Sequence, residues 1–232
     1  INININQNAV ANGFTYNPTT GVYTYKPQNV KGNWYGNIGL YDTFPLDNKN
    51  NFTLVNAIVY SYNRNVYFTG VTGQTESMLS KVNNHWLEDN LSLNYQKGGL
   101  TCSLVGEMKW RYAYSRRENF STIRTLDFNY GMLGSYKFKF GLETGMDLKM
   151  FSRRGYSDPL INTNDLICNV YISKSFLKGK LAAKLEGYDI FHQLKSISYE
   201  INGQGRTETR FNAIPNYLML HLIYKMNISG KK

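Results

Sequence analysis

The stretch TCSLVGEMKWRYAYSRR, residues 101–117, mixes charged and apolar side chains in a regular order. Counted from Leu100, the even positions are Leu100, Cys102, Leu104, Gly106, Met108, Trp110, Tyr112 and Tyr114. The odd positions are Thr101, Ser103, Val105, Glu107, Lys109, Arg111, Ala113 and Ser115. Because side chains on a β-strand alternate between its two faces, the pattern predicts one long strand with an apolar face and a charged face. Whether the apolar face contacts a protein core or lipid decides the class of protein.

The same alternation recurs along the chain. It is clear at 123–133, 138–151 and 217–226, and rougher at 33–46, 52–68, 82–96, 165–176 and 180–191. Asn56 interrupts the apolar positions of one rough segment, and Asp89 those of another. With a first strand at about 1–9, these segments predict an all-β chain of about ten strands.

The connections between the strands alternate in length. Short turns are predicted at 47–51, 97–99, 135–137 and 178–180. Longer polar links are predicted at 10–32, 69–81, 152–164 and 192–212, with a shorter one at 116–122. Outer-membrane barrels have short turns at one end and long loops at the other, whereas a sandwich needs Greek-key crossings. We therefore expect an antiparallel up-and-down transmembrane β-barrel.

Composition and charge narrow the class further. Of 232 residues, 18% are charged and 15% aromatic. Because no run of about 18 apolar residues exists, a transmembrane helix is excluded. The net charge of +10 is spread along the chain, which argues against nucleic acid as a partner. Cys102 and Cys168 fall on the apolar faces of strands that are not neighbours, so we expect small apolar side chains rather than a disulfide.

Strand length and aromatic placement indicate that the apolar face meets lipid. A tilted membrane strand needs about 9–11 residues, so part of 100–115 is expected to project beyond the membrane. Aromatic residues near both strand ends suit the membrane interfaces, and we assign to these girdles Trp110, Tyr112, Tyr114, Phe138 and Tyr224. The expected lipid-facing side chains are Leu104, Met108, Phe140, Leu142, Leu218, Leu220 and Leu222. A wet lumen is expected to be lined by Glu107, Lys109, Arg111, Glu143, Asp147, Lys149, Lys184 and Glu186.

Two interpretations of the lumen charges remain open. They form a polar path or a lining that contacts a plug, or they are simply solvated and ion-paired across strands. The face assignment is testable, since Arg on the lipid face near the midplane costs roughly 2–4 kcal/mol. We expect a charge at Leu104 or Leu142 to block assembly, and the same charge at Ser103 or Gly145 to be tolerated.

Basic residues of the loops are expected at the outer rim of the barrel. They include Arg116, Arg117, Arg153 and Arg154. Because guanidinium groups bind phosphate in bidentate fashion, these residues suit the phosphates of lipopolysaccharide or another anionic ligand. Solvated loop positions are the alternative.

Catalysis and metal binding have little support in the sequence. His85, His192 and His221 lie in different strands without metal-ligand spacing. A rim protease needs paired acids and an Asp–His couple, and only Asp189 with His192 offers such a couple. We expect no enzyme activity, no metal and no cofactor.

Two C-terminal stretches, LAAKLEGYDIFHQ (181–193) and RFNAIPNYLMLHLIYKM (210–226), carry a resemblance. They resemble the end of TonB-dependent receptor barrels, and most of all the related outer-membrane β-barrel family of Bacteroidetes. Such barrels have an Asp-aromatic-Asn-like motif, an extracellular hairpin and a last strand ending Tyr-Lys/Arg-Phe. Residues 188–193 and 224–226 stand in those places, with His192 for the usual Asn and Met226 for the terminal aromatic residue, which resembles an assembly signal.

The resemblance implies a ligand-gated importer in the outer membrane of a Gram-negative bacterium. Its lumen would be closed by an N-terminal plug domain and opened through an energy-coupling protein, with a surface lipoprotein as a further partner. Outer-membrane lipid and lipopolysaccharide would surround it. No segment of 1–232 matches such a plug, so we expect these residues to form one barrel domain, the C-terminal portion of a larger barrel.

Two other classes of function stay open beside transport. One is a non-transporting outer-membrane barrel that acts as a scaffold or interaction component of a surface complex. The other is a soluble sandwich or a rim enzyme, which a chain that stays in aqueous solution without detergent would favour.

Overall fold

The computed structural model describes residues 1–6, 9–70, 75–117, 120–194, 197–201, 206–210, 214 and 216–226. Within these ranges the regular structure is β-strand, apart from two short 3-10 turns at Pro159–Ile161 and Leu177–Gly179. The prediction of an all-β chain is confirmed.

Ten strands form one antiparallel sheet. In order across the sheet they are β1 (Asn2–Asn6), β4 (Asn33–Pro45), β5 (Phe52–Thr69), β6 (Met78–Lys97), β7 (Leu100–Ser115), β8 (Ile123–Lys137), β9 (Leu142–Arg154), β10 (Asn164–Phe176), β11 (Leu181–Tyr188) and β14 (Tyr217–Tyr224). This up-and-down antiparallel order agrees with the prediction. The sheet is open, because its edge strands β1 and β14 do not pair with each other, and the described strands therefore do not close a barrel.

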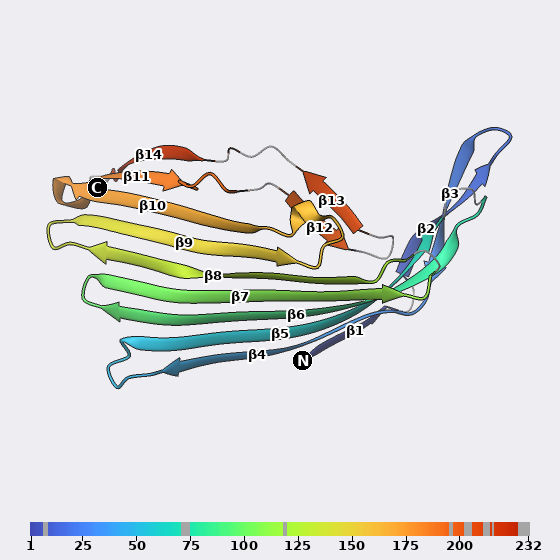
Figure 1. Ribbon diagram of the computed structural model, residues 1–232, viewed down its shortest axis with the longest axis horizontal. Coiled ribbons are helices and arrows are strands. Elements are labelled where there is room, and N and C mark those ends of the chain that lie inside the picture. The colour runs from blue at the N-terminus through green and yellow to red at the C-terminus, as the bar shows by residue number, and fades with distance from the viewer. Residues whose placement is uncertain are drawn as a thin grey trace, which may run out of the picture.

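Short and long connections lie at opposite ends of the sheet (Figure 1). Two of the long connections hold hairpins. Their strands are β2 (Ala9–Asn17) with β3 (Val22–Val30), and β12 (Ile197–Ile201) with β13 (Arg206–Arg210). The sequence did not predict the first, whereas the resemblance places an extracellular hairpin where the second lies. The first strand, β1, also ends at Asn6, before the predicted boundary, and β6 begins at Met78, inside the predicted link 69–81.

The turn between β4 and β5 shows why a polar stretch reverses the chain there. The backbone N–H of Phe52 donates to Asp47 Oδ1 at 2.8 Å, and Asn51 Nδ2 donates to Asp47 Oδ2 at 2.8 Å. The hydrogen bond from Phe52 is the largest of the effects that lower the pKa of Asp47 below its ordinary value. The carboxylate of Asp47 thus fixes the turn.

The turn between β8 and β9 lies later than predicted. Strand β8 extends to Lys137 and β9 begins at Leu142, so Phe138 and Phe140 lie in the turn and not in a strand. Gly141 has a φ of +83°, a region that glycine enters at little cost, and Phe138 N donates to Leu142 O at 2.8 Å. Phe140 is therefore an exposed turn residue rather than a side chain on a strand face.

The cross-strand register gathers the apolar side chains of one parity onto one face of the sheet, here called the apolar face. Residues directly opposite each other in an antiparallel pair point to the same side. One row of such partners crosses β5 to β10 through Leu54, Leu93, Leu104, Met132, Leu148 and Cys168. Another row reaches the sheet edge through Thr144, Ile172, Leu185 and Leu220. The opposite side is called the polar face.

The apolar face is largely uncovered. The ten strands form a single layer (Figure 1), and the side chains of Leu104, Leu220 and Leu222 stay 53%, 64% and 69% exposed. Soluble monomers rarely expose contiguous apolar patches larger than a few hundred Å². Met108, Leu142 and Leu218 lie on the same face, as do the free thiols Cys102 and Cys168.

The β2–β3 hairpin packs against the long-loop end of β5. Ala11, Val30 and Val66 form a small buried cluster there. Phe14 N donates to Ser77 Oγ at 2.8 Å, and Ser77 N donates to Phe14 O at 2.9 Å. These contacts attach the hairpin to the strands that follow it.

Three polar side chains interrupt the apolar face on β4, β5 and β6. Asn56 lies directly opposite Asp42, and its Nδ2 donates to Asp89 Oδ1 at 2.7 Å. The two interruptions seen in the sequence, Asn56 and Asp89, thus meet in space. Their hydrogen bond partly offsets the cost of placing polar groups on an apolar surface.

Candidate functional site

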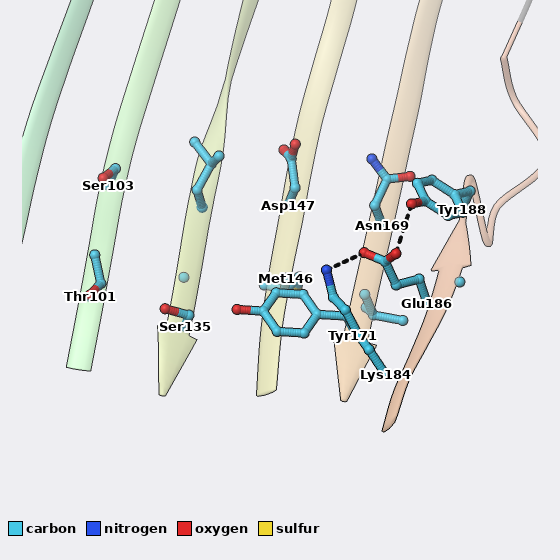
Figure 2. A pocket seen from close by; sticks show the side chains of 14 residues that line it. Thr101, Ser103, Ser135, Met146, Asp147, Asn169, Tyr171, Lys184, Glu186 and Tyr188 are labelled. Atoms are coloured by element: carbon cyan, nitrogen blue, oxygen red, sulfur yellow. Dashed lines mark hydrogen bonds and ion pairs between the residues drawn. The ribbon is translucent and has the colours of Figure 1, made fainter. Parts of the chain in front are cut away.

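The polar face carries a hollow of about 340 Å³ between β7 and β11, here called the polar pocket (Figure 2). Five neighbouring strands contribute to it, because their polar-parity positions lie side by side in the register. Its polar lining consists of Thr101, Ser103, Ser135, Asp147, Asn169, Tyr171, Lys184, Glu186 and Tyr188. Asp147, Lys184 and Glu186 are residues that the sequence predicted for a lumen.

Glu186 is the centre of a charged network in the polar pocket. Lys184 Nζ lies 2.5 Å from Glu186 Oε1, and His221 Nε2 lies 2.7 Å from Glu186 Oε2. The hydroxyl of Tyr188 donates to Glu186 Oε2 at 3.0 Å. The period of two places Lys184, Glu186 and Tyr188 on one face of β11, and the register places His221 of β14 directly opposite Lys184.

Tyr171 connects this network to β9. Its hydroxyl donates to Glu143 Oε1 at 2.6 Å, and Lys184 Nζ lies 4.5 Å from its ring centroid, within cation–π range. Gly145 lies directly opposite on β9, where a Cβ atom would overlap the Tyr171 ring. Any side chain at Gly145 must displace the Tyr171 ring, so the prediction that a charge is tolerated there requires that ring to move.

Asp147 offers an acceptor that the surrounding protein leaves unused. Its Oδ2 lies 3.6 Å from Lys149 Nζ, two residues further along β9. Its Oδ1 is buried and accepts no hydrogen bond from any described residue. A buried oxygen without a donor is costly, so Asp147 is a strained member of the pocket lining.

Glu107, Lys109 and Arg111 lie on the same face, further toward the long-loop end. Asn129 Nδ2 donates to Glu107 Oε2 at 2.8 Å, and Lys109 lies directly opposite Asp127 on β8. The charges predicted for the lumen therefore share one face but divide into two groups. Of the eight, Asp147, Lys184 and Glu186 line the polar pocket.

The loop after β9 folds over the group that contains Glu107, Lys109 and Arg111. Tyr156 and Ile161 are buried, and the Tyr156 hydroxyl lies 2.8 Å from each oxygen of Asp127, to which it donates. Burial first, and then the hydrogen bond to Asp127, raises the pKa of Tyr156 well above its ordinary value. Arg111 and Arg153 lie close enough to oppose that rise. Arg153 is half-buried and lies directly opposite Asp127 on β8.

The neighbouring Arg154 is engaged within its own loop. Its Nη1 donates to Thr163 O at 3.1 Å, and its Nη2 donates to Asn164 Oδ1 at 2.7 Å. These bonds tie the end of β9 to the start of β10. The sequence grouped Arg153 and Arg154 as rim bases, but the structure gives them different partners.

Arg116 and Arg117 lie at the end of β7. Arg117 Nη1 donates to Thr69 Oγ1 at 2.8 Å, whereas the side chain of Arg116 is exposed. Both line a hollow to which Arg64 and Lys81 also contribute. The sequence did not single out Arg64 or Lys81, because they belong to different strands and only the register brings them near Arg116.

Aromatic side chains form a belt on the apolar face toward the long-loop end, here called the long-loop belt. Neighbouring ring centroids lie between 4.3 and 6.0 Å apart among Trp34, Tyr62, His85, Tyr112, Tyr114 and Trp110. A second group, the short-turn belt, contains Phe52, Tyr95, Tyr136, Phe138, Phe140 and Tyr224. The residues predicted for two girdles thus lie near opposite ends of the strands.

Asp189 and His192, which the sequence offered as an Asp–His couple, lie in one turn after β11. Asp189 Oδ2 accepts from Leu194 N at 2.7 Å, and His192 N donates to Asp189 O at 2.8 Å, so both residues shape a turn. Within the ranges that the structure describes, no three His, Cys, Asp or Glu side chains are grouped so as to hold a metal ion.

Asn169 and Tyr171 are pocket residues that the sequence did not single out. His221 was considered only as a metal ligand, although it contacts Glu186 of the pocket. All three occupy the polar parity of their strands, so parity alone contained a signal for them. The ring of Tyr171 obscured it, because an aromatic residue is read as apolar in a pattern count. Donors, acceptors and aromatic surfaces converge in the polar pocket, and this arrangement suits binding of a polar ligand.

Comparisons with models of protein families, with curated proteins and with solved structures found no match. Among the described residues, no helix has the length and apolar character needed to cross a membrane. The fold and site define an open antiparallel sheet with one apolar face and one polar, pocketed face. The resemblance to TonB-dependent receptors stays a prediction.

Proposed function

We propose that this chain is part of the wall of an outer-membrane β-barrel, and that the barrel belongs to a TonB-dependent receptor-like transporter. The observation that carries the proposal is the uncovered apolar face, which lies between two aromatic belts. Lipid is the occupant that suits such a face, because hydrocarbon covers apolar side chains and the interfaces favour Trp and Tyr.

The polar ends of the belt residues support this orientation. Tyr and Trp prefer positions where one part of the ring is in an apolar medium and the polar atom is in a wet one. Tyr60 adjoins the long-loop belt, and its hydroxyl lies 2.7 Å from His85 Nδ1. Within the belt, the Tyr62 hydroxyl donates to Asn83 Oδ1 at 2.5 Å. Polar groups thus meet one another where the apolar band ends.

Strand length supports a membrane span. Strands β8, β9 and β10 contain 15, 13 and 13 residues, and a tilted span needs about 9–11. Strands β5 and β6 are longer, at 18 and 20 residues. On this proposal their additional residues project beyond the bilayer at the long-loop end.

Two observations support the transporter part of the proposal. The polar pocket, at about 340 Å³, falls at the lower end of the roughly 300–1,000 Å³ of small-molecule sites. The β12–β13 hairpin precedes the last strand at the long-loop end, where the resemblance places an extracellular hairpin. A polar ligand would pass along the polar face, in contact with Lys184, Glu186 and Tyr188.

The face assignment is tested by one matched pair of substitutions in the full-length protein. Leu104→Arg places a charge on the apolar face and should abolish the heat-modifiable, urea-resistant form in outer membranes, at a cost of roughly 2–4 kcal/mol. Ser103→Arg places the same charge in the polar pocket and should leave that form intact. Equal loss with both variants contradicts the proposal.

A non-transporting scaffold is the second candidate, and the β2–β3 hairpin favours it. Ring centroids of Phe14, Tyr16, Tyr23 and Tyr25 lie 4.5 to 6.4 Å apart, and Tyr23 and Tyr25 are exposed. Aromatic residues are enriched at protein interfaces. If the chain is a scaffold, Tyr23→Ser with Tyr25→Ser should remove a protein that otherwise co-purifies at fixed stoichiometry. If it is a transporter, the purified composition should not change.

A further inference from the structure

The long-loop ends of β5, β6 and β7 surround a second hollow, of about 670 Å³, here called the basic hollow. Its basic side chains are Arg64, Lys81, Arg116 and Arg117. Among the described residues, no Asp or Glu lines this hollow and no salt bridge involves these four side chains. Four positive charges therefore share one concave surface, and such a site attracts anions.

The register places the basic hollow next to the long-loop belt. Arg64 follows Tyr62 by two residues on β5, and Asn83 and Tyr114 are its successive cross-strand partners on β6 and β7. Arg64 therefore lies level with Trp34 and Tyr114 of the belt. Lys81 lies on the same face of β6 as Asn83, two residues nearer the long-loop end. It lies about 6.6–6.8 Å beyond that row, because two residues of a strand advance by this distance.

The arginines differ in how far the protein holds them in place. Arg117 is oriented by its bond to Thr69 Oγ1 and by the ring of Phe120, 5.4 Å from its guanidinium carbon. A guanidinium has five N–H donors, so Arg117 keeps donors for a ligand. Arg116 is exposed and Arg64 half-buried, and neither has a described acidic partner.

Along this face, an apolar band is followed by aromatic rings, and positive charge lies level with the outermost rings and beyond them. A bilayer presents hydrocarbon, interface and phosphate in the same order. A soluble anion requires only the positive charge, whereas a lipid also requires the adjoining apolar surface. Leu79, which is exposed, and Tyr114 continue that apolar surface into the hollow.

We propose that the basic hollow binds the phosphate groups of an outer-leaflet lipid, a phosphorylated glycolipid of the lipid A type, while its acyl chains lie on the apolar face. The inference rests on the proposed function, because it takes the apolar face to be lipid-facing. Arg64 and Arg116 are the principal ligands, since guanidinium groups match phosphate oxygens in bidentate fashion.

The test uses full-length protein extracted from outer membranes, with bound lipid A measured by native mass spectrometry. Arg64→Gln with Arg116→Gln removes two charges from the hollow and should weaken lipid A binding at least about tenfold, since hydrogen bonds from a charged group to phosphate are stronger than neutral ones. Lys178→Gln with Lys180→Gln removes two charges at the short-turn end and should leave binding unchanged. Equal affinity in both double variants overturns the inference.

Two further probes distinguish a lipid from a free anion. Lipid A stripped of its phosphates should bind the unaltered protein as weakly as intact lipid A binds the Arg64→Gln, Arg116→Gln variant. Inorganic pyrophosphate should fail to displace intact lipid A at comparable concentration. Full displacement by pyrophosphate would show that the hollow binds free phosphate anions and not a lipid.

Failure of this inference is distinguishable from failure of the proposed function. Resistance of the chain to alkaline extraction from the membrane is measured first. A chain that is extracted refutes both the membrane assignment and the lipid site. A chain that stays embedded, with lipid A binding unaffected by Arg64→Gln and Arg116→Gln, refutes the lipid site alone.

Discussion

Asn56 and Asp89 are two polar side chains at positions where the alternation of apolar and polar residues predicts apolar ones. They form a hydrogen-bonded pair with a distance of 2.7 Å. A polar group left without a partner in an apolar environment costs more than its hydrogen bond contributes. The protein should therefore be more stable with both residues than with either one alone.

This pairing leads to a prediction for the two residues. Asn56→Leu removes the donor and leaves the Asp89 carboxylate without it, so the free energy of unfolding should fall by about 1–3 kcal/mol. Asn56→Leu combined with Asp89→Leu removes both polar groups and should recover most of that loss. Urea unfolding of the membrane-inserted protein measures both effects. Losses that simply add in the double variant contradict the pairing.

At the scale of strands, close approach of two backbones is as important as side-chain parity. Gly131 on β8 lies opposite Lys149 on β9, and a Cβ atom there would overlap the carbonyl oxygen of Leu148. Gly134, on the same strand, would place its Cβ no closer than 3.9 Å to Thr101 O. The β8–β9 pairing thus requires glycine at one position and not at the other.

We therefore predict different effects for the two glycines. Gly131→Ala forces β8 and β9 apart and should lower the free energy of unfolding by about 1–3 kcal/mol, as overpacking does. Gly134→Ala should change it by less than about 1 kcal/mol, because an ordinary van der Waals contact forms and alanine restricts the unfolded chain. Thermal unfolding in detergent compares them, and similar destabilisation by both would contradict the close approach at Gly131.

The sequence predicted the strands better than their ends and contacts. Parity is local, so Leu104, Met108 and Glu186 could be assigned to faces from the pattern alone. The contact between Glu186 and His221 depends on the register of β11 with β14, which no local pattern contains. Phe138 was misplaced because the alternation continues through the turn, where the positive φ of Gly141 reverses the chain.

The β2–β3 hairpin and the basic hollow were missed for related reasons. Residues 10–32 are polar and rich in Gly and Asn, so β2 and β3 gave no clear alternation, although they pair along their whole length. Arg64 and Lys81 lie in separate strands, and each alone is an ordinary charged residue. Only the alignment of β5, β6 and β7 shows that they surround one hollow with Arg116.

At the scale of the molecule, the sheet is one layer with two chemically different faces and two open edges at β1 and β14. Open edges present unpaired backbone groups and favour pairing with further strands. On our proposal, such strands join β1 and β14 and close the wall, with the apolar face outward and the polar pocket inward. The proposal is tested most directly by asking which face of the sheet lies in lipid.

That test measures which face lies in lipid. In protein lacking Cys102 and Cys168, a spin label is attached to a single cysteine placed in turn at Leu104, Val105, Glu107 or Met108, and the protein is inserted into vesicles. We predict that labels at Leu104 and Met108 collide mainly with oxygen, which concentrates in hydrocarbon. Labels at Val105 and Glu107 should collide mainly with a water-soluble nickel complex. Equal accessibility at all four positions, or the reverse order, would contradict a lipid-facing apolar surface.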